Sequence, residues 1–341
     1  MRRAAAGLVG LGAAVALSAC DPVIQLTSSP VGFDAPPAPA VTAPATCTAP
    51  GPANAVSAFS DTIGGRFRTW RVYTPPAVCT RSGGNFVRTP IVVAMHGAFE
   101  SAASFVDDSR FAALAASQNI FVIFPDAYFG SWNDGRAGVD APAFNEDVDD
   151  VAFVVSIVDR LVSDSAGDGR RTYAMGFSNG AMMANRLACD RGDRFAAVGL
   201  VAGFGPGNPA IGSICQPDRA MPVVVIASSN DPIVPYNGGY ISTLSCVGGG
   251  AVDCGRGVST SAADLLNLWN TRNGCGNASA PTAITATFGG GQRTTYSGCG
   301  AALEHDRLTD TVHEYYKRPG ASEQIYDPTA RVWNFFNGKI R

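Results

Sequence analysis

The sequence predicts an α/β fold in which helices cover both faces of a mostly parallel central sheet. Short, continuously apolar segments alternate along the chain with longer segments whose apolar residues recur at helical spacing. Strands that are buried on both faces, as in a parallel sheet, give such continuous apolar runs. In addition, one serine stands in a G-x-S-x-G motif between an apolar run and a helical segment. Strand–helix alternation of this kind favours one sheet covered by helices.

The first expected elements follow from apolar periodicity. Residues 67–73 alternate between apolar and polar, as a half-buried strand does. The runs 90–95 and 120–124 are continuously apolar, which is typical of strands buried on both faces. Between these two runs, residues 102–118 have the composition of a helix.

A second helix is expected at 146–162, where apolar residues form a stripe at helical spacing. Asn145, Glu146 and Asp147 stand at its start, and their side chains suit a helix cap and the helix dipole. The later elements, in order, are a strand at 171–177, a helix at 181–188, strands at 195–202 and 221–227, a helix at 262–271, strands at 282–288 and 304–316, and a helix at 328–336.

The N-terminal residues predict export from the cytoplasm. Positive charge at 2–3 precedes an apolar run at 4–17 that is short for a membrane span, so we expect a signal peptide at 1–19. Residues 17–20, with the sequence LSAC, resemble a bacterial lipobox in which Cys20 becomes the lipidated N-terminus. The alternative is an ordinary cleavage site with an incidental cysteine.

Composition divides the remaining chain into two parts. Residues 20–54 begin with the lipobox cysteine and are rich in Pro, Ala, Thr and Ser, as in an extended tether. Residues 55–341 form one expected domain, and a hydrophobic content of 46% supplies a large core. The net charge of −3 and the lack of a basic run argue against a nucleic-acid partner. We expect an extracellular or cell-envelope protein that reaches the membrane through a lipid on Cys20.

The cysteines are consistent with export. The chain has nine, and setting Cys20 aside leaves eight, an even number that predicts disulfides in an exported protein. No C-x-x-C motif is present, so neither a zinc site nor a thioredoxin-like site is expected. Sequence alone leaves the connectivity open. We expect neighbours in the chain to pair, since each pair then brackets a single loop or excursion: Cys47–Cys79, Cys189–Cys215, Cys246–Cys254 and Cys275–Cys299.

The G-x-S-x-G motif is Gly176-Phe177-Ser178-Asn179-Gly180. An apolar strand before it and a helix after it make the context of a nucleophile elbow, in which a tight turn exposes the serine hydroxyl. Glycines flank the turn because side chains there would collide with the neighbouring strand and helix. The alternative is a chance match in a chain with 39 glycines.

A serine needs a base to accept its proton and an acid to orient that base. In the α/β-hydrolase arrangement the acid and then the histidine follow the serine in the chain. Of the three histidines, His96 precedes Ser178, which leaves His305 and His313. We expect His313 to be the base, because it lies near the end of the last expected strand. His305 is expected to be a surface residue within that strand.

The expected acid is Asp231, which follows the strand at 221–227 and so lies at the catalytic edge of an open α/β sheet. The alternative is an Asp-Pro turn without a chemical role. Asp253 and Asp264 fit less well, because the first lies in a loop rich in Cys and Gly and the second begins a helix.

Two backbone N–H groups are expected to form an oxyanion hole, which stabilises the negative charge of an acyl-transfer intermediate. One belongs to Asn179, the residue after the nucleophile. The other belongs to the loop after the strand at 90–95, where we expect Ala98 to donate. Gly97 beside it allows the close backbone approach that such a loop needs.

Taken together, these motifs resemble the polyhydroxybutyrate depolymerase/feruloyl esterase family of secreted α/β-hydrolases. The resemblance extends from about residue 66 to the C-terminus and rests on the segments 95–98, 132–135, 148–153, 176–183, 195–198 with 201–203, and 230–238. It implies that 55–341 is an α/β-hydrolase catalytic domain with a Ser178–His313–Asp231 triad and no metal or organic cofactor. The implied substrates are esters of hydroxyalkanoate polymers or oligomers, feruloylated or acetylated plant polymers, or related aryl and alkyl esters.

The resemblance also places Trp132 where family members often have an aromatic residue beside the acyl pocket; the alternative is a tryptophan in the core. Two segments depart from the family. The usual Gly-His-x-Trp-Pro segment is here Val312-His313-Glu-Tyr-Tyr, and the oxyanion loop has Ala98-Phe99-Glu100 where Cys and Gln are common. These departures leave the substrate open.

A hydroxyalkanoate esterase is the leading interpretation, and a feruloyl or acetyl esterase is the alternative. A binding lipoprotein that keeps the fold without the chemistry is a third interpretation, motivated by the divergent His313 segment. A peptidase of the same fold ranks lower, since no inserted lid domain is visible. The Gly-rich segment 236–257 is either a loop that shapes substrate access or a stabilised surface excursion.

Overall fold

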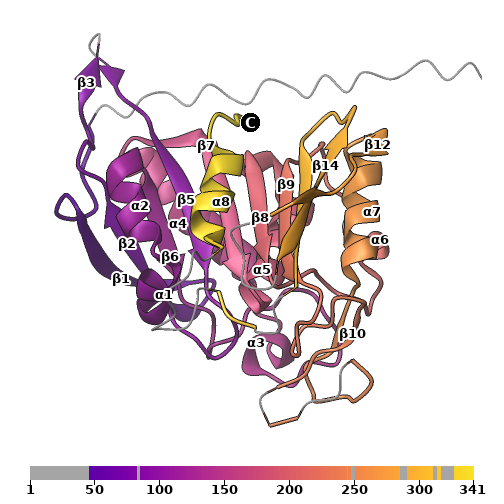
Figure 1. Ribbon diagram of the computed structural model, residues 1–341. Helices are drawn as coiled ribbons and strands as arrows, with labels where there is room; N and C mark the ends of the chain where they lie inside the picture. The colour runs from indigo at the N-terminus through magenta and orange to yellow at the C-terminus, as the bar shows by residue number, and fades with distance from the viewer. Residues whose placement is uncertain are drawn as a thin grey trace, which may run out of the picture. The chain divides into compact units, whose positions relative to one another are not determined.

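The computed structural model describes residues 46–82, 85–243, 245–246, 250–284, 290–309, 313–315 and 326–341 (Figure 1). The expected signal peptide, the lipobox cysteine and the tether as far as residue 45 lie outside the described residues. In the described part of the chain, no helix combines the length and the apolar character that a membrane span requires.

The described residues form an eleven-stranded sheet with the strand order β1-β2-β6-β5-β7-β8-β9-β15-β14-β12, and β13 pairs with β14 (Figure 1). Neighbours from β6 to β15 are parallel, and the pairs outside this block are antiparallel. The strands are β1 (Ala55–Ile63), β2 (Arg66–Thr74), β5 (Thr89–Met95), β6 (Phe121–Pro125), β7 (Gly167–Phe177), β8 (Ala197–Val201), β9 (Val223–Ser228), β12 (Asn277–Ala278), β13 (Thr282–Ala283), β14 (Gly291–Ser297) and β15 (Leu303–Leu308).

The predicted parallel sheet is therefore confirmed at its centre. Strands β6, β8 and β9 are buried along their whole length, as their continuous apolar sequences require. Two short hairpins lie outside the sheet: β3 (Arg81–Ser82) with β4 (Asn85–Phe86), and β10 (Gly239–Tyr240) with β11 (Val258–Ser259).

Helices cover both faces of the sheet, as expected. One face packs against α4 (Asp150–Asp164), α5 (Asn179–Asp190) and α7 (Ala262–Arg272). The other packs against α1 (Ala102–Ser109), α2 (Phe111–Gln118) and α8 (Pro328–Phe336) (Figure 1). The remaining helical turns are α3 (Pro142–Asn145), η1 (Gly192–Arg194) and α6 (Ile211–Ile214).

Some predicted boundaries were wrong. The helix expected at 102–118 is two helices, because Arg110 adopts a left-handed backbone conformation that ends α1. The helix expected from 146 begins at Asp150, where the side chain of Asp149 accepts the N–H of Ala152 and caps it.

The C-terminal strands differ from expectation as well. The strand expected at 282–288 is a two-residue bridge at 282–283, and 285–289 lie outside the described residues. These two residues pair with β14, a strand that was not predicted, and β14 pairs in turn with β15. The strand expected at 304–316 ends at Leu308.

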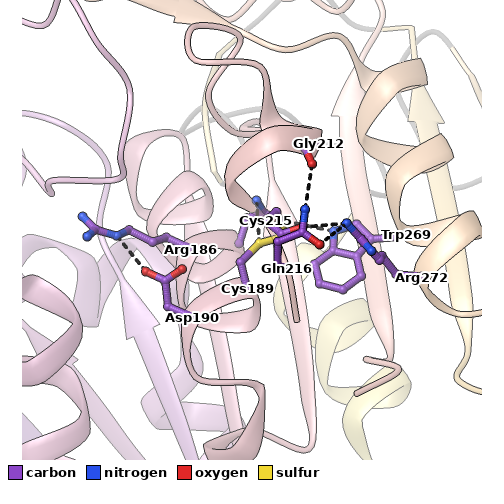
Figure 2. The surroundings of a disulfide bond; sticks show 9 residues. Arg186, Cys189, Asp190, Gly212, Cys215, Gln216, Trp269 and Arg272 are labelled. Carbon is purple, nitrogen blue, oxygen red and sulfur yellow. Dashed lines mark hydrogen bonds and ion pairs between the residues drawn. A yellow bond between two sulfur atoms is a disulfide. The ribbon is translucent and has the colours of Figure 1, made fainter. Parts of the chain in front are cut away.

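The four expected disulfides are all present. Cys189–Cys215 joins the end of α5 to the residue after α6, and Figure 2 shows the contacts around it. Arg272 of α7 donates to the carbonyl of Cys215 and to the side chain of Gln216. The disulfide and these hydrogen bonds therefore fasten together the three helices around the end of α5.

Candidate active site

Ser178 lies between the end of β7 and the start of α5, with φ 53° and ψ −120°. A residue other than glycine has a strained backbone in this conformation. Such strained residues are often found at functional sites. Its N–H donates to the carbonyl of Val201 in β8 at 2.8 Å, so the neighbouring strand fixes the turn. The expected strand–serine–helix context is confirmed.

The two motif glycines are required by close backbone contacts. A Cβ atom on Gly176 would lie 2.1 Å from the carbonyl oxygen of Gly180. One on Gly180 would lie 2.3 Å from the carbonyl oxygen of Met95, at the end of β5. Real Cβ contacts of this length do not occur, so the expected collision with neighbouring strand and helix is confirmed.

Ser178, His313 and Asp231 form a continuous hydrogen-bonded chain. The Oγ of Ser178 lies 2.9 Å from Nε2 of His313, and Nδ1 of His313 lies 2.6 Å from Oδ2 of Asp231. The Asp231 side chain is 3% exposed and that of His313 is 12% exposed, so water competes little for either group. The nucleophile, base and acid predicted from sequence are thus brought together.

Asp231 is fixed by its own turn. Its other carboxylate oxygen, Oδ1, accepts the N–H groups of Ile233 and Val234 at 2.8 and 2.9 Å. From the sequence, an Asp-Pro turn and a partner of histidine are alternative roles for Asp231. In the structure one carboxylate oxygen forms the turn while the other contacts His313.

His313 lies against Phe177, with ring centroids 4.9 Å apart. Two residues later, Tyr315 is buried between Phe105 and Phe177, and its hydroxyl contacts that of Thr329 in α8 at 2.9 Å. Tyr315 belongs to the segment that departs from the family pattern. The buried ring of Tyr315 therefore anchors in the core the segment that carries His313.

His305 was expected at the surface of a strand, and this prediction was wrong. It is 5% exposed, because β15 is an interior strand and Tyr236 packs on the imidazole at a centroid distance of 6.0 Å. Burial lowers the pKa of His305 to about 4, so it is neutral near pH 7. Among the described residues, His313 is the histidine that contacts Ser178.

The loop after β5 is held by His96. Nε2 of His96 accepts the N–H of Ala127 at 3.1 Å, so the proton is assigned to Nδ1, which donates to the carbonyl of Gly97 at 2.7 Å. Burial lowers the pKa of His96, in keeping with a neutral ring. The third histidine is therefore a support for the loop.

The N–H of Ala98 lies between two N–H groups that are already engaged. Gly97 donates to Glu100 and Phe99 donates to the carbonyl of Gly130, each at 2.8 Å. Ala98 and Asn179 line the same cavity as Ser178. Asn179 begins α5, and the first N–H groups of a helix have no acceptor within it. Both residues are thus placed suitably for the expected oxyanion hole.

Trp132 does not lie where the resemblance suggested. It is fully buried, and it is not among the described residues that line the cavity. Its indole N–H donates to the carbonyl of His96 at 2.9 Å, and its backbone N–H donates to Oδ1 of Asn179 at 2.7 Å. The alternative of a core tryptophan is correct, and the side chain braces the oxyanion loop from behind.

A buried ion pair that was not predicted from the sequence lies behind the elbow, between Asp134 and Arg136. Oδ2 of Asp134 accepts the side-chain amide of Asn179 at 2.6 Å, and the carboxylate pairs with Arg136 at 2.8 Å. Both side chains are at most 5% exposed. Asp134 lies in the 132–135 segment that carried the family resemblance, and that was the available signal.

Ser178 opens onto a cavity of about 600 Å³. Its walls are mostly apolar, but they include charged side chains on both the oxyanion loop and the segment 236–257. The segment therefore shapes the site, as one of the two sequence interpretations held. The lining residues include Phe99, Glu100, Arg136, Arg256 and Glu314.

The family model described as "Esterase PHB depolymerase" matches residues 70–266. Feruloyl esterase B of Piromyces equi is 30% identical over 191 residues, which cover 54% of this chain and 33% of that protein. Feruloyl esterase C of Emericella nidulans is 30% identical over 170 residues, covering 48% of this chain and 49% of that protein. The chain thus spans half or less of the length of these two relatives.

Among solved structures, the acetyl xylan esterase from Aspergillus awamori superposes with a TM-score of 0.55 at 15% identity. The alignment covers 82% of this chain and 98% of that one. At this identity the similarity establishes the fold, which is the predicted α/β-hydrolase fold.

Proposed function

Because the chain belongs to the esterase PHB depolymerase family, we propose that it is a serine esterase that hydrolyses carboxylic esters through an acyl-enzyme. The observation that carries this proposal is the hydrogen-bonded chain from Asp231 through His313 to Ser178, of which His313 and Ser178 line one cavity. A nucleophile, a base and an orienting acid in this arrangement are sufficient for acyl transfer.

Acylation begins when Oγ of Ser178 attacks the ester carbonyl carbon and its proton passes to Nε2 of His313. Asp231, which accepts a hydrogen bond from Nδ1–H of His313, stabilises the imidazolium that forms. The N–H groups of Ala98 and Asn179 stabilise the tetrahedral oxyanion. His313 then returns its proton to the leaving alkoxide, and the alcohol departs.

Deacylation repeats these steps with water. His313 removes a proton from the water, the resulting hydroxide attacks the acyl carbon, and the same two N–H groups hold the second oxyanion. Collapse of this intermediate returns the proton to Ser178 and releases the carboxylic acid. The buried Asp134–Arg136 pair has a positioning role, because it orients the side chain of Asn179.

We propose hydroxyalkanoate oligomers or polymers as the substrates, as for a polyhydroxybutyrate depolymerase. Aryl esters such as feruloyl esters, and acetyl esters, are the second candidate class, because the names of the relatives point to them. A panel of p-nitrophenyl esters, hydroxybutyrate oligomers and methyl ferulate distinguishes these classes by their kcat/KM.

The decisive control in that panel is Ser178→Ala. We expect turnover to fall by about 10⁴-fold or more, because the residual rate comes only from binding and the oxyanion hole. Unchanged turnover in the variant would overturn the proposed nucleophile. A folded wild-type protein that turns over none of the esters would instead favour the binding lipoprotein.

We also propose that the chain is exported, with a signal peptide at 1–19, a lipid on Cys20, a tether to residue 54 and the catalytic domain at 55–341. The four disulfides support an oxidising compartment. The intact mass of the mature protein and its distribution between membrane and soluble fractions test the anchor. Cys20→Ala should move the protein to the soluble fraction; retention in the membrane would contradict lipidation at this residue.

A further inference from the structure

Arg256 is a cation in the wall of the catalytic cavity, and its guanidinium is paired with no carboxylate of the described residues. Among the described residues it forms no ion pair and no side-chain hydrogen bond. The other arginine in the wall, Arg136, differs in this respect, since it pairs with the buried carboxylate of Asp134. The charge of Arg256 is therefore available to a ligand, whereas that of Arg136 is not.

The carboxylates that line the cavity do not neutralise Arg256. Glu100 accepts the N–H of Gly97, and Glu314 is exposed to solvent; neither forms an ion pair with Arg256. Burial and the neighbouring charge of Arg136 lower the pKa of Arg256, while Asp140 raises it from beyond ion-pair distance. A bound anion would relieve this unfavourable environment.

Phe99 orients the guanidinium. The Cζ atom of Arg256 lies 4.4 Å from the centroid of the Phe99 ring, within the range of a cation–π contact. Phe99 is 67% exposed and has φ 67°, a strained conformation for an aromatic residue, and its N–H is fixed by the carbonyl of Gly130. The loop therefore holds an aromatic face at the cavity. The planar guanidinium rests on this face, and none of its N–H groups donates to a residue in the described ranges.

Phe99 and Arg256 line the same cavity as the expected reacting groups. Phe99 directly follows Ala98, the expected oxyanion donor, and Arg256 lies in the same cavity as Ser178. A cavity of about 600 Å³ has the size of a small-molecule site. The segment that carries Arg256 is fastened by Cys246–Cys254 and by a hydrogen bond from Arg136 to the carbonyl of Arg256.

We propose that Arg256, resting on Phe99, is a specificity-determining residue that binds a carboxylate carried by the ester substrate. A guanidinium presents paired N–H groups that match the two oxygens of a carboxylate. The inference rests on the proposed esterase function and narrows its substrates to esters with an acidic end. That carboxylate has two sources: the free acid terminus of a hydroxyalkanoate oligomer, or an acid group on an aryl ester.

The test compares matched esters that differ only in the carboxylate. The first pair is the 3-hydroxybutyrate dimer as free acid and as its N-methyl amide. The second pair is 4-carboxyphenyl butyrate and the same ester with its carboxyl group capped as an N-methyl amide. The readout is the ratio of kcat/KM for the acid to kcat/KM for the capped ester. A general loss of activity in a variant lowers both values equally and leaves this ratio unchanged.

In Arg256→Gln we expect this ratio to fall by about tenfold, the effect of losing one charge-assisted pair in a half-buried site. Arg256→Lys should retain part of the selectivity. The matched control is Arg307→Gln, since Arg307 also rests on an aromatic ring, that of Tyr236, and does not line the cavity. A fall for only one of the two substrate pairs identifies the source of the carboxylate.

An unchanged ratio in Arg256→Gln, or an equal fall in Arg307→Gln, would overturn the subsite. If the wild type turns over none of these esters, the proposed esterase function fails instead. In that case, calorimetry measures the affinity of the free-acid dimer for the Ser178→Ala variant and for the Ser178→Ala, Arg256→Gln double variant. A lower affinity of the double variant supports carboxylate binding by Arg256. Equal affinity in the two proteins would contradict it.

Discussion

Gly180 and Met95 are in backbone contact across the active site: a Cβ atom added to Gly180 would lie 2.3 Å from the carbonyl oxygen of Met95. This contact joins the first turn of α5, which follows the nucleophile, to the end of β5, which precedes the oxyanion loop. The two parts of the expected oxyanion hole, Ala98 and Asn179, are therefore set by a contact that only glycine permits.

Gly180→Ala should consequently destabilise the protein and impair turnover. We expect a loss of about 1–3 kcal/mol in the free energy of unfolding, as for other overpacked sites, because backbone must move. Urea unfolding measures it. Gly212→Ala is the matched control, since nothing lies within 4 Å of a Cβ atom at that helical glycine. Equal stability of both variants would show that the contact relaxes without cost.

Asp231→Asn should preserve the turn but abolish most of the catalytic activity. The amide oxygen can still accept hydrogen bonds from the N–H groups of Ile233 and Val234. The NH₂ group, however, cannot accept a hydrogen bond from Nδ1–H of His313. We expect kcat to fall by about 10⁴-fold with little change in stability. Asp253→Asn is the control, because within the described part of the chain the Asp253 carboxylate accepts the N–H of Gly255 and no other hydrogen bond. Comparable losses in the two variants would argue against Asp231 as the orienting acid.

Stability should fall between pH 7 and pH 5 because of His305. Its pKa is lowered from 6.5 to about 4 by burial, so in this range the unfolded chain binds a proton that the folded chain does not. Linkage then makes stability rise with pH, and the residue accounts for a loss on the order of 2 kcal/mol on acidification. Urea unfolding at both pH values measures the loss. The His305→Gln variant should not show this part of the loss of stability on acidification. The same pH dependence of stability in the variant and the wild type would refute the role of His305.

Removal of Cys189–Cys215 by paired substitution to alanine should lower the free energy of unfolding by about 3 kcal/mol, since the bond closes a long loop. The bond spans 26 residues and fastens α5 beside α6 and α7 (Figure 2). The same change at Cys246–Cys254, which spans 8 residues, should cost about 1 kcal/mol less. Denaturant unfolding of both double variants checks the order. The reverse order would show that strain or residual structure outweighs loop length.

Local patterns in the sequence determined much of this protein. Continuous apolar runs predicted β5, β6 and β9, because strands buried on both faces leave no position for a polar side chain. The elbow was predictable because its requirements are local: a strand, a serine on a tight turn, a helix, and glycines where backbones meet. The order of the cysteines predicted the disulfides, since each pair closes one excursion of the chain.

Tertiary structure decided what depends on residues distant in the chain. Nothing near Trp132 in sequence shows that its indole lies behind the oxyanion loop, and nothing near His305 shows that Tyr236 covers it. The same holds for Arg256, whose neighbour Phe99 is far away in the chain. The burial of a side chain, its hydrogen-bond partners and the charges around it all depend on contacts between segments that are distant in the chain. Sequence therefore determined which side chains were available, and packing decided which of them face the cavity.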